Sequence, residues 1–142
     1  MRKLKVKMLV DMEPPAYAHE GDAGLDLRAA EDVTLQPGES RFVRLGIAVE
    51  IPVGCVGLQF PRSGLGSKGI TLRYAVGVID SGYRGEVKAA LWNTTEDVFE
   101  VHAGDRVCQL VVMPYVPCMV EIADELSESE RGTDGYGSTG VE

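Results

Sequence analysis

Five short segments of the chain combine glycine with charged or hydroxyl-bearing residues, which is unusual for the loops of an ordinary β protein. They are AGLDLRA from Ala23, PRSGLGSKGI from Pro61, GVIDSGYRGE from Gly77, GDRVCQLV from Gly104 and RGTDGYGSTG from Arg131. Glycine lets backbone N–H groups approach an anion closely, and arginine presents a planar set of donors to phosphate oxygens. The segments therefore predict a site where carboxylates, arginines and backbone groups carry the chemistry.

The second segment has the composition of a phosphate-binding loop. Arg62 offers a planar guanidinium group, Ser63 a hydroxyl group, and Gly64 an accessible backbone N–H. Gln109 lies in the apolar run 107–113, where an amide needs a hydrogen-bonding partner. On the local sequence alone two alternatives stay open, a glycine-rich turn whose arginine pairs with a surface carboxylate and a core glutamine satisfied by backbone.

The third segment, GVIDSGYRGE, predicts a hairpin because two apolar stretches flank the turn residues Ser81 and Gly82. Such a hairpin would hold Asp80 and Tyr83 close together. A carboxylate in this position is either a turn residue or a functional group, and the segment alone leaves both alternatives open.

The five segments follow one another over residues 23–140 and resemble the five ordered motifs of trimeric deoxyuridine triphosphate pyrophosphatases (dUTPases). Five motifs at compatible spacing are far more specific than one glycine-rich loop. The resemblance implies a distorted jelly-roll or β-clip sandwich that forms a homotrimer with sites shared between subunits. It also implies hydrolysis of dUTP to dUMP and pyrophosphate with Mg²⁺, which limits uracil incorporation into DNA and supplies dUMP for thymidylate synthesis.

By this resemblance the third motif carries the catalytic group and the nucleoside pocket. Asp80 is implied as the general base for the attacking water, while Tyr83 packs under the deoxyribose and excludes a 2′-hydroxyl group. Tyr74 stands where many relatives have Asn, so no side-chain amide contact to uracil is predicted. The remaining residues implied for base recognition, mainly through their backbone, are Val76, Gly77, Val78, Ile79 and Lys88.

The resemblance assigns the triphosphate to the second, fourth and fifth motifs. Asp26 in the first motif is implied either to organise a metal-bound water or to orient an arginine that faces the phosphates. Mg²⁺ is expected to be bound by the triphosphate, because the sequence offers no dedicated carboxylate cage. The residues implied for the phosphate chain are Arg62, Ser63, Gly64 and Gln109. Those implied for an arm that closes over the nucleotide are Arg131, Tyr136, Gly137 and Ser138.

The elements that must position these residues are strands. Apolar residues alternate with polar ones over residues 4–10, 43–51, 56–60, 70–78 and 87–91, and the run 110–113 predicts a strand buried on both faces. No segment sustains a 3.6-residue period for three turns, so at most one short helix is expected, near Ser63 to Ser67. The prediction is an all-β domain over residues 1–124 and a mobile arm over residues 125–142.

Composition limits the classes of protein that fit. The 142 residues suit one domain, and the net charge of −8 disfavours nucleic acid as a partner. No apolar run is long enough for a membrane span, so no membrane partner is expected. Three cysteines without CxxC spacing and only two histidines argue against a disulfide framework and a multi-histidine metal centre. A cytoplasmic location is therefore expected.

Two other functions are compatible with parts of this sequence. Deoxycytidine triphosphate deaminases share the fold that the resemblance implies, but their catalytic glutamate would fall near Ala89 or Ala90, where this chain has no carboxylate. A nucleotide-sensing or partner-binding module that retains the pocket for regulation is the alternative from a different class. Measurement of pyrophosphate release distinguishes it from an enzyme.

Overall fold

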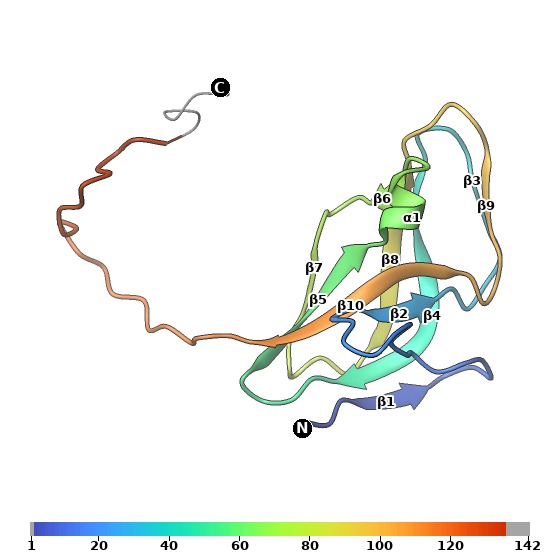
Figure 1. Ribbon diagram of the computed structural model, residues 1–142, viewed down its shortest axis with the longest axis horizontal. Coiled ribbons are helices and arrows are strands. Elements are labelled where there is room, and N and C mark those ends of the chain that lie inside the picture. The colour runs from blue at the N-terminus through green and yellow to red at the C-terminus, as the bar shows by residue number, and fades with distance from the viewer. Residues whose placement is uncertain (1, 136–142) are drawn as a thin grey trace.

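Two four-stranded sheets dominate the structure, a computed structural model that describes residues 2–135 (Figure 1). The first sheet contains, in spatial order, β1 (Lys5–Met8), β4 (Ser40–Glu50), β8 (Glu86–Asn93) and β6 (Ile70–Leu72). The second contains β2 (Leu25–Arg28), β10 (Arg106–Pro114), β5 (Cys55–Pro61) and β7 (Gly77–Ile79). A third, two-stranded sheet pairs β3 (Val33–Leu35) with β9 (Phe99–Val101). Within the sheets every pairing is antiparallel.

The core lies between the two larger sheets. Strand alternation directs one face of each strand inward, as in β10, where Cys108 and Leu110 are buried and Gln109 and Val111 are not. The largest fully buried apolar side chains come from all three sheets and from the residue after β4, and are Leu27, Leu35, Leu45, Ile47, Ile51, Ile70, Leu91 and Leu110. Burial of this apolar surface is the main source of stability.

One helix, α1 (Ser63–Gly66), occurs in residues 2–135, directly after β5. The all-β prediction with at most one short helix is therefore confirmed, because β-branched and alternating residues leave no segment able to bury a helical face. With only four residues, this helix is too short to cross a membrane, and the described part of the chain contains no helix that could do so.

The strand predicted over residues 70–78 is wrong as a single element. The chain breaks after β6 into a turn, in which the Ala75 N–H donates to the Leu72 carbonyl over 3.1 Å, and resumes as β7 in the other sheet. The predicted hairpin is also wrong, since β7 pairs with β5 whereas β8 pairs with β4 and β6. Only the turn remains, closed by the Tyr83 N–H donating to the Asp80 carbonyl over 3.1 Å.

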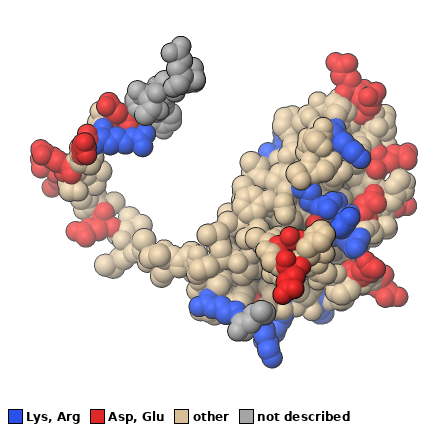
Figure 2. Space-filling model, viewed as in Figure 1, with Lys and Arg blue, Asp and Glu red and all other residues tan. Residues whose placement is uncertain are grey.

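The prediction that residues 110–113 are buried on both faces is wrong for this chain by itself. One face of β10 is in the core, but on the outward face Val111 is half-buried and Met113 is 44% exposed. Val111 lies opposite Leu58 of β5, which lies opposite Val78 of β7, so an apolar row crosses the outer face of the sheet. Figure 2 shows that the surface over β5 and β7 is almost free of charged side chains.

Regular structure ends at Pro114, well before the boundary predicted at Asp124, and residues 115–135 extend away from the sheets as an irregular segment (Figure 1). Residues 115–126 of this segment include apolar side chains that are exposed, because this part of the chain does not pack against the sheets. The exposed side chains are Tyr115, Val116, Met119, Val120, Ile122 and Leu126. The mobility of an arm over residues 125–142 stays a prediction.

Asn93, at the end of β8, joins three parts of the fold and gives a test of it. Its fully buried amide nitrogen donates to the carbonyls of Leu35 and Asp97 over 3.1 and 2.7 Å, and its oxygen accepts from the Thr95 N–H over 3.0 Å. We expect Asn93→Ala to lower the free energy of unfolding by about 3 kcal/mol, because buried carbonyls lose their donors. Urea denaturation measures this, with exposed Glu96→Ala as the control at about 0.5 kcal/mol or less. Equal losses in both variants would contradict the role of Asn93.

Candidate active site

A cleft of about 370 Å³ gathers the residues predicted to bind phosphate. We call it the arginine cleft. It lies where the end of β5 and the start of α1 meet β2 and β10, and the loop before β2 forms its rim. Its lining includes the predicted residues Asp26, Arg62, Ser63, Gly64 and Gln109.

Two arginines converge on one carboxylate in this cleft. Arg62 Nε lies 2.8 Å from Asp26 Oδ1, and Arg106 Nη1 lies 3.1 Å from Asp26 Oδ2. The Asp26 side chain is only 15% exposed, so these charge-assisted bonds operate with little competition from water. Arg62 also donates to the Arg106 carbonyl over 3.2 Å. Asp26 therefore holds both guanidinium groups in fixed orientations.

Gln109 points from β10 into the same cleft rather than into the core. Its register places it opposite Asp26 on one side and Phe60 on the other, and its Nε2 donates to the Pro61 carbonyl over 2.9 Å. Gly24 allows this approach, because a Cβ there would collide with Gln109 Oε1. A core glutamine would lie on the inward face of β10, whereas a residue that contacts a ligand would lie on the outward face. Gln109 lies on the outward face, in the lining of the arginine cleft.

A second cleft, of about 360 Å³, gathers the residues of the third motif. We call it the tyrosine cleft. It lies at the edge of the sandwich, between β7 and the turn after it on one side and β4 and β8 on the other. The predicted residues in its lining are Gly77, Val78, Ile79, Asp80, Tyr83 and Lys88. Val76 is exposed and does not line the cleft.

Tyr83 and Asp80 are held by the main chain around them. The Tyr83 hydroxyl group donates to the Glu86 carbonyl over 3.0 Å, which fixes the ring although 47% of the residue is exposed. The Asp80 side chain is exposed, and its carbonyl accepts from the Tyr83 N–H. The cleft therefore offers a carboxylate beside a fixed aromatic ring.

The tyrosine cleft also contains two residues that the sequence reasoning missed, one polar and one aromatic. Gln59 is 2% exposed, and its Nε2 donates to Cys108 Sγ over 3.3 Å, while its Oε1 accepts from the Tyr74 hydroxyl group. Phe42, 65% exposed, forms part of the opposite wall from β4. Gln59 could have been identified from the sequence, because a glutamine within the alternating run 56–60 needs a hydrogen-bonding partner if it is buried. Nothing in the sequence around Phe42 indicates that it lines a cleft.

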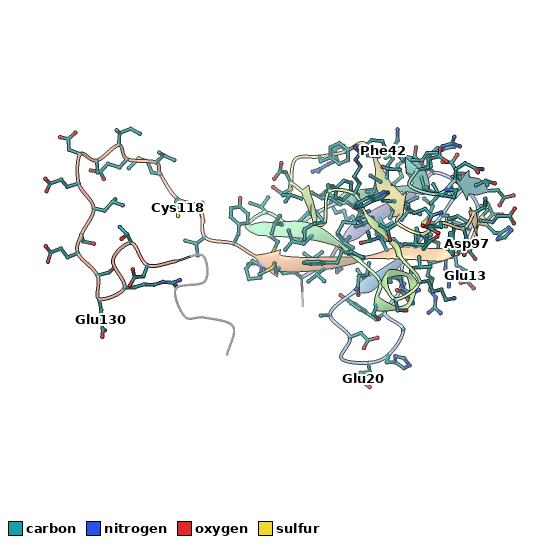
Figure 3. The ribbon with its side chains drawn as sticks, turned by 90° about the horizontal axis from the view of Figure 1, so that it is seen from above. Glu13, Glu20, Phe42, Asp97, Cys118 and Glu130 are labelled. Atoms are coloured by element: carbon teal, nitrogen blue, oxygen red, sulfur yellow. The ribbon has the colours of Figure 1, made fainter. Side chains whose placement is uncertain are left out.

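The two clefts lie on different sides of the second sheet. Consecutive residues of a strand face opposite sides, and Gln59 lines the tyrosine cleft while Phe60 lines the arginine cleft. Figure 3 shows the same separation, with Phe42 on one side of the body and the loop that carries Glu20 on the other. The predicted phosphate residues and the predicted base therefore do not meet within one chain.

The predicted residues of the fifth motif lie away from both clefts or outside the described residues. Arg131 belongs to the extended segment, where its Nε donates to the Asp134 carbonyl over 2.7 Å within a local turn (Figure 1). Tyr136, Gly137 and Ser138 lie outside the residues that the structure describes.

Comparison with known proteins assigns the family. The family model described as dUTPase matches residues 11–140, which is most of the chain. This chain belongs to the dUTPase family. The match covers both clefts and the segment that follows β10, so the family assignment and the site geometry refer to the same residues.

Curated relatives named deoxyuridine 5'-triphosphate nucleotidohydrolase agree with this assignment. The protein from Hahella chejuensis is 48% identical over 131 residues, which cover 89% of this dUTPase and 86% of the relative. The protein from an Azoarcus species is 45% identical over 147 residues, which cover 99% of each chain. The similarity therefore extends over nearly whole proteins rather than over isolated motifs.

Solved structures support the fold. A variant of the Staphylococcus bacteriophage 80alpha dUTPase, determined with dUpNHpp, has a TM-score of 0.93 and 32% identity, covering 99% of this dUTPase and 100% of that chain. A variant dUTPase from phage phi11 of S. aureus, described with a structural Mg(II) ion, has a TM-score of 0.81 and 28% identity and covers 87% and 98% of the two chains. The jelly-roll expectation is consistent with these neighbours.

Cys108, below the tyrosine cleft, gives a pH-dependent prediction. Burial raises the pKa of its thiol from the ordinary 9.0 to about 12. Between these values the unfolded thiol loses its proton while the folded thiol keeps it, so stability is fully present below pH 9 and falls as pH rises toward 12. The loss is at most about 1.4 kcal/mol per pH unit for one thiol. Wild type should therefore lose more stability above pH 9 than Cys108→Ala, which has no thiol at this position. Urea denaturation at a series of pH values checks this, and parallel profiles would contradict it.

Proposed function

We propose that this dUTPase hydrolyses dUTP to dUMP and pyrophosphate at sites formed by the arginine cleft of one subunit and the tyrosine cleft of its neighbour. The observation that carries the proposal is that the two clefts contain different functional groups. One contains fixed guanidinium groups, a hydroxyl group and a glycine-rich turn, which suit a triphosphate. The other contains a carboxylate and a fixed ring, which suit a nucleoside and an attacking water.

In the arginine cleft, Arg62 with Ser63 and Gly64 would bind the phosphate oxygens. The pairing of Asp26 with both Arg62 and Arg106 supports its role in orienting an arginine. Gln109, anchored to the Pro61 carbonyl, keeps its amide oxygen beside the phosphate chain. Fixed donors of this kind stabilise the charge that moves onto pyrophosphate without reorganising during the reaction.

Magnesium would arrive with the nucleotide rather than occupy a protein cage. No group of three or more His, Cys, Asp or Glu side chains in residues 2–135 could hold a metal ion. Both oxygens of Asp26 already face guanidinium groups, which leaves this carboxylate suited to an indirect contact only. The donor set therefore fits a Mg²⁺ complex of the triphosphate as the substrate.

In the tyrosine cleft, Asp80 would orient the attacking water and accept its proton, so that the water attacks the α-phosphorus. Tyr83 would pack against the deoxyribose and exclude a 2′-hydroxyl group, because its ring is fixed by the bond to the Glu86 carbonyl. The backbone of Gly77 and Val78, Ile79 beneath it and the backbone of Lys88 would select uracil by shape. Val76, which does not line the cleft within one chain, would act through the turn before β7.

A homotrimer explains how the two clefts meet. The apolar row on the outer face of the second sheet is half-buried at Val111 and Leu58 and exposed at Val78 in the single chain, and contiguous apolar surface of this kind marks an interface. The exposed apolar side chains of residues 115–126 suit a segment that packs on a neighbouring subunit. We propose that this segment carries Arg131, Tyr136, Gly137 and Ser138 to a site on another subunit, as closed cyclic symmetry allows.

The state of the cysteines supports a cytoplasmic location. Cys55, Cys108 and Cys118 are all free, and the exposed Cys118 would be vulnerable in an oxidising compartment. We propose that the enzyme works where thiols stay reduced and where deoxynucleotides are made.

The assignment of Asp80 predicts a separation of binding from turnover. Asp80→Asn should lower kcat for dUTP by about 10²-fold or more, because the amide keeps the shape of the side chain but accepts no proton. Binding of a non-hydrolysable dUTP analogue, measured by calorimetry, should stay within a few fold. Asp97→Asn, which changes an exposed carboxylate at the far end of the body (Figure 3), is the control. Near-normal turnover by folded Asp80→Asn would overturn the role of this residue.

The shared site predicts complementation between inactive variants. Asp80→Asn disables the tyrosine cleft and Arg62→Gln disables the arginine cleft, so each protein should be inactive by itself. Equal amounts, unfolded and refolded together, should make about one site in four complete, because each cleft must come from the chain in which it is intact.

Separately refolded variants that are mixed without exchange are the control for complementation and should stay inactive. Sedimentation identifies mixed trimers. No recovery of dUTP hydrolysis in confirmed mixed trimers would show that both clefts of a site come from one chain, and would overturn the shared site.

A further inference from the structure

The Tyr74 hydroxyl group connects two strands beside the tyrosine cleft to the turn that contains it. It donates to Gln59 Oε1 of β5 and lies 3.4 Å from the Lys88 carbonyl oxygen of β8. The Ala90 N–H of β8 approaches the same hydroxyl oxygen at 3.4 Å. Since β5 and β8 belong to different sheets and Tyr74 precedes β7, one hydroxyl group fixes the segment before β7 relative to both sheets.

Gln59 is a rigid partner for this hydroxyl group. It is 2% exposed, and its Nε2 is already committed to Cys108 Sγ over 3.3 Å. Its oxygen therefore faces Tyr74, and loss of the tyrosine hydroxyl group would leave a buried acceptor without a protein partner. Burial likewise raises the pKa of the Tyr74 hydroxyl group, which keeps it protonated and able to donate at neutral pH.

The turn that Tyr74 begins is strained. The Val76 N–H donates to the Tyr74 carbonyl over 2.7 Å, and Ala75 between them has a φ of 60°. This is a γ-turn with a positive central φ, a rare and strained conformation for alanine, and such residues persist only where the surrounding structure holds them. The contacts of Tyr74 on one side and the pairing of β7 with β5 on the other provide that support.

The ring of Tyr74 also packs against the start of β7. A Cβ built on Gly77 would lie 3.1 Å from Tyr74 Cε2 and 3.1 Å from Gln59 Oε1. The backbone of Gly77 thus rests directly on the Tyr74 and Gln59 side chains, and all three residues line the tyrosine cleft. A shift of the Tyr74 ring would therefore displace the Gly77 backbone in the wall of the cleft directly, because no side chain lies between them.

We infer that Tyr74 is a positioning residue for nucleotide selection, which holds the strained turn at Ala75 and thereby fixes the backbone of Gly77 and Val78 that forms one wall of the tyrosine cleft. The inference rests on the proposed function, because it assumes that this cleft receives the nucleoside. A wall held in one conformation rejects a wrong base by steric clash and by unpaired polar groups, whereas a wall that relaxes accepts more than one base.

The test is Tyr74→Phe, which keeps the ring and removes the hydroxyl group. KM for dUTP should rise about tenfold, and the ratio of kcat/KM for dUTP to that for dCTP and dTTP should fall about tenfold, the equivalent of one hydrogen bond to a buried group. The kcat for dUTP should change by less than about twofold, because Asp80 is untouched. Thr34→Val, which removes one exposed hydroxyl group from β3 at a residue that lines neither cleft, is the matched control and should leave all values unchanged.

A double variant separates positioning from stability. Tyr74→Phe with Gln59→Met removes both polar partners, so the melting temperature lost in Tyr74→Phe should largely return. Selectivity should stay low, because the turn is still not tethered to β5. Hydrogen exchange read on peptides should also be faster over residues 75–79 in both variants and unchanged over 43–50 of β4.

Each outcome decides the matter. If the wild-type enzyme hydrolyses dUTP and Tyr74→Phe has the same selectivity and KM as wild type, the inference is overturned and the proposed function stays intact. Selectivity that returns with stability in the double variant would also overturn it, since Tyr74 would then act only on folding. A wild-type enzyme without dUTP turnover would overturn the proposed function and this inference together.

Discussion

The alternation of side chains along β5 is the constraint on which the rest of the structure depends. Because consecutive residues face opposite sides, Gln59 enters the sandwich edge while Phe60 faces outward, and the strand then delivers Arg62 and α1 at its end. A slip of one residue in the pairing with β10 would exchange these faces. The buried Gln59 amide, bonded to Cys108 and Tyr74, makes such a slip costly.

The arginine cleft is a local cluster of positive charge on an acidic protein. The net charge of −8 repels anions at long range, yet Arg62 and Arg106 are brought together by one carboxylate. Asp26 neutralises half of the combined charge of the two guanidinium groups and fixes their orientation. The cleft therefore attracts anions less strongly but holds its donors in a defined arrangement. Such a site favours a ligand with several oxygens in a defined arrangement over a simple anion.

The fold class was predictable because period-two alternation is a strong local signal, as in β4 and β8. The strands at 25–28, 33–35 and 99–101 were missed since each is too short to show a period, and their pairing is set by partners distant in sequence. The hairpin prediction failed for a related reason, because nothing in GVIDSGYRGE reveals that β7 pairs with β5 instead of β8. Motifs identified many residues of each cleft but not Gln59 or Phe42. The separation of Asp80 from Arg62 depends on which face of the sheet each strand presents. The role of Tyr74 lay outside sequence reasoning, since it rests on hydrogen bonds to Gln59 and Ala90.

The exposed apolar segment after Pro114 has a consequence for the life of a newly made chain. Under the proposed assembly, a chain that has not yet met other copies presents Val116, Val120 and Ile122 to water. It also exposes the nearly uncharged face of β5 and β7 (Figure 2). Such a surface attracts chaperones and proteases, and it pairs readily with itself at high concentration. The time between synthesis and assembly is then the most vulnerable period of the protein. Its cellular abundance should depend on how quickly sister chains are produced near one another, as on polysomes of a single transcript.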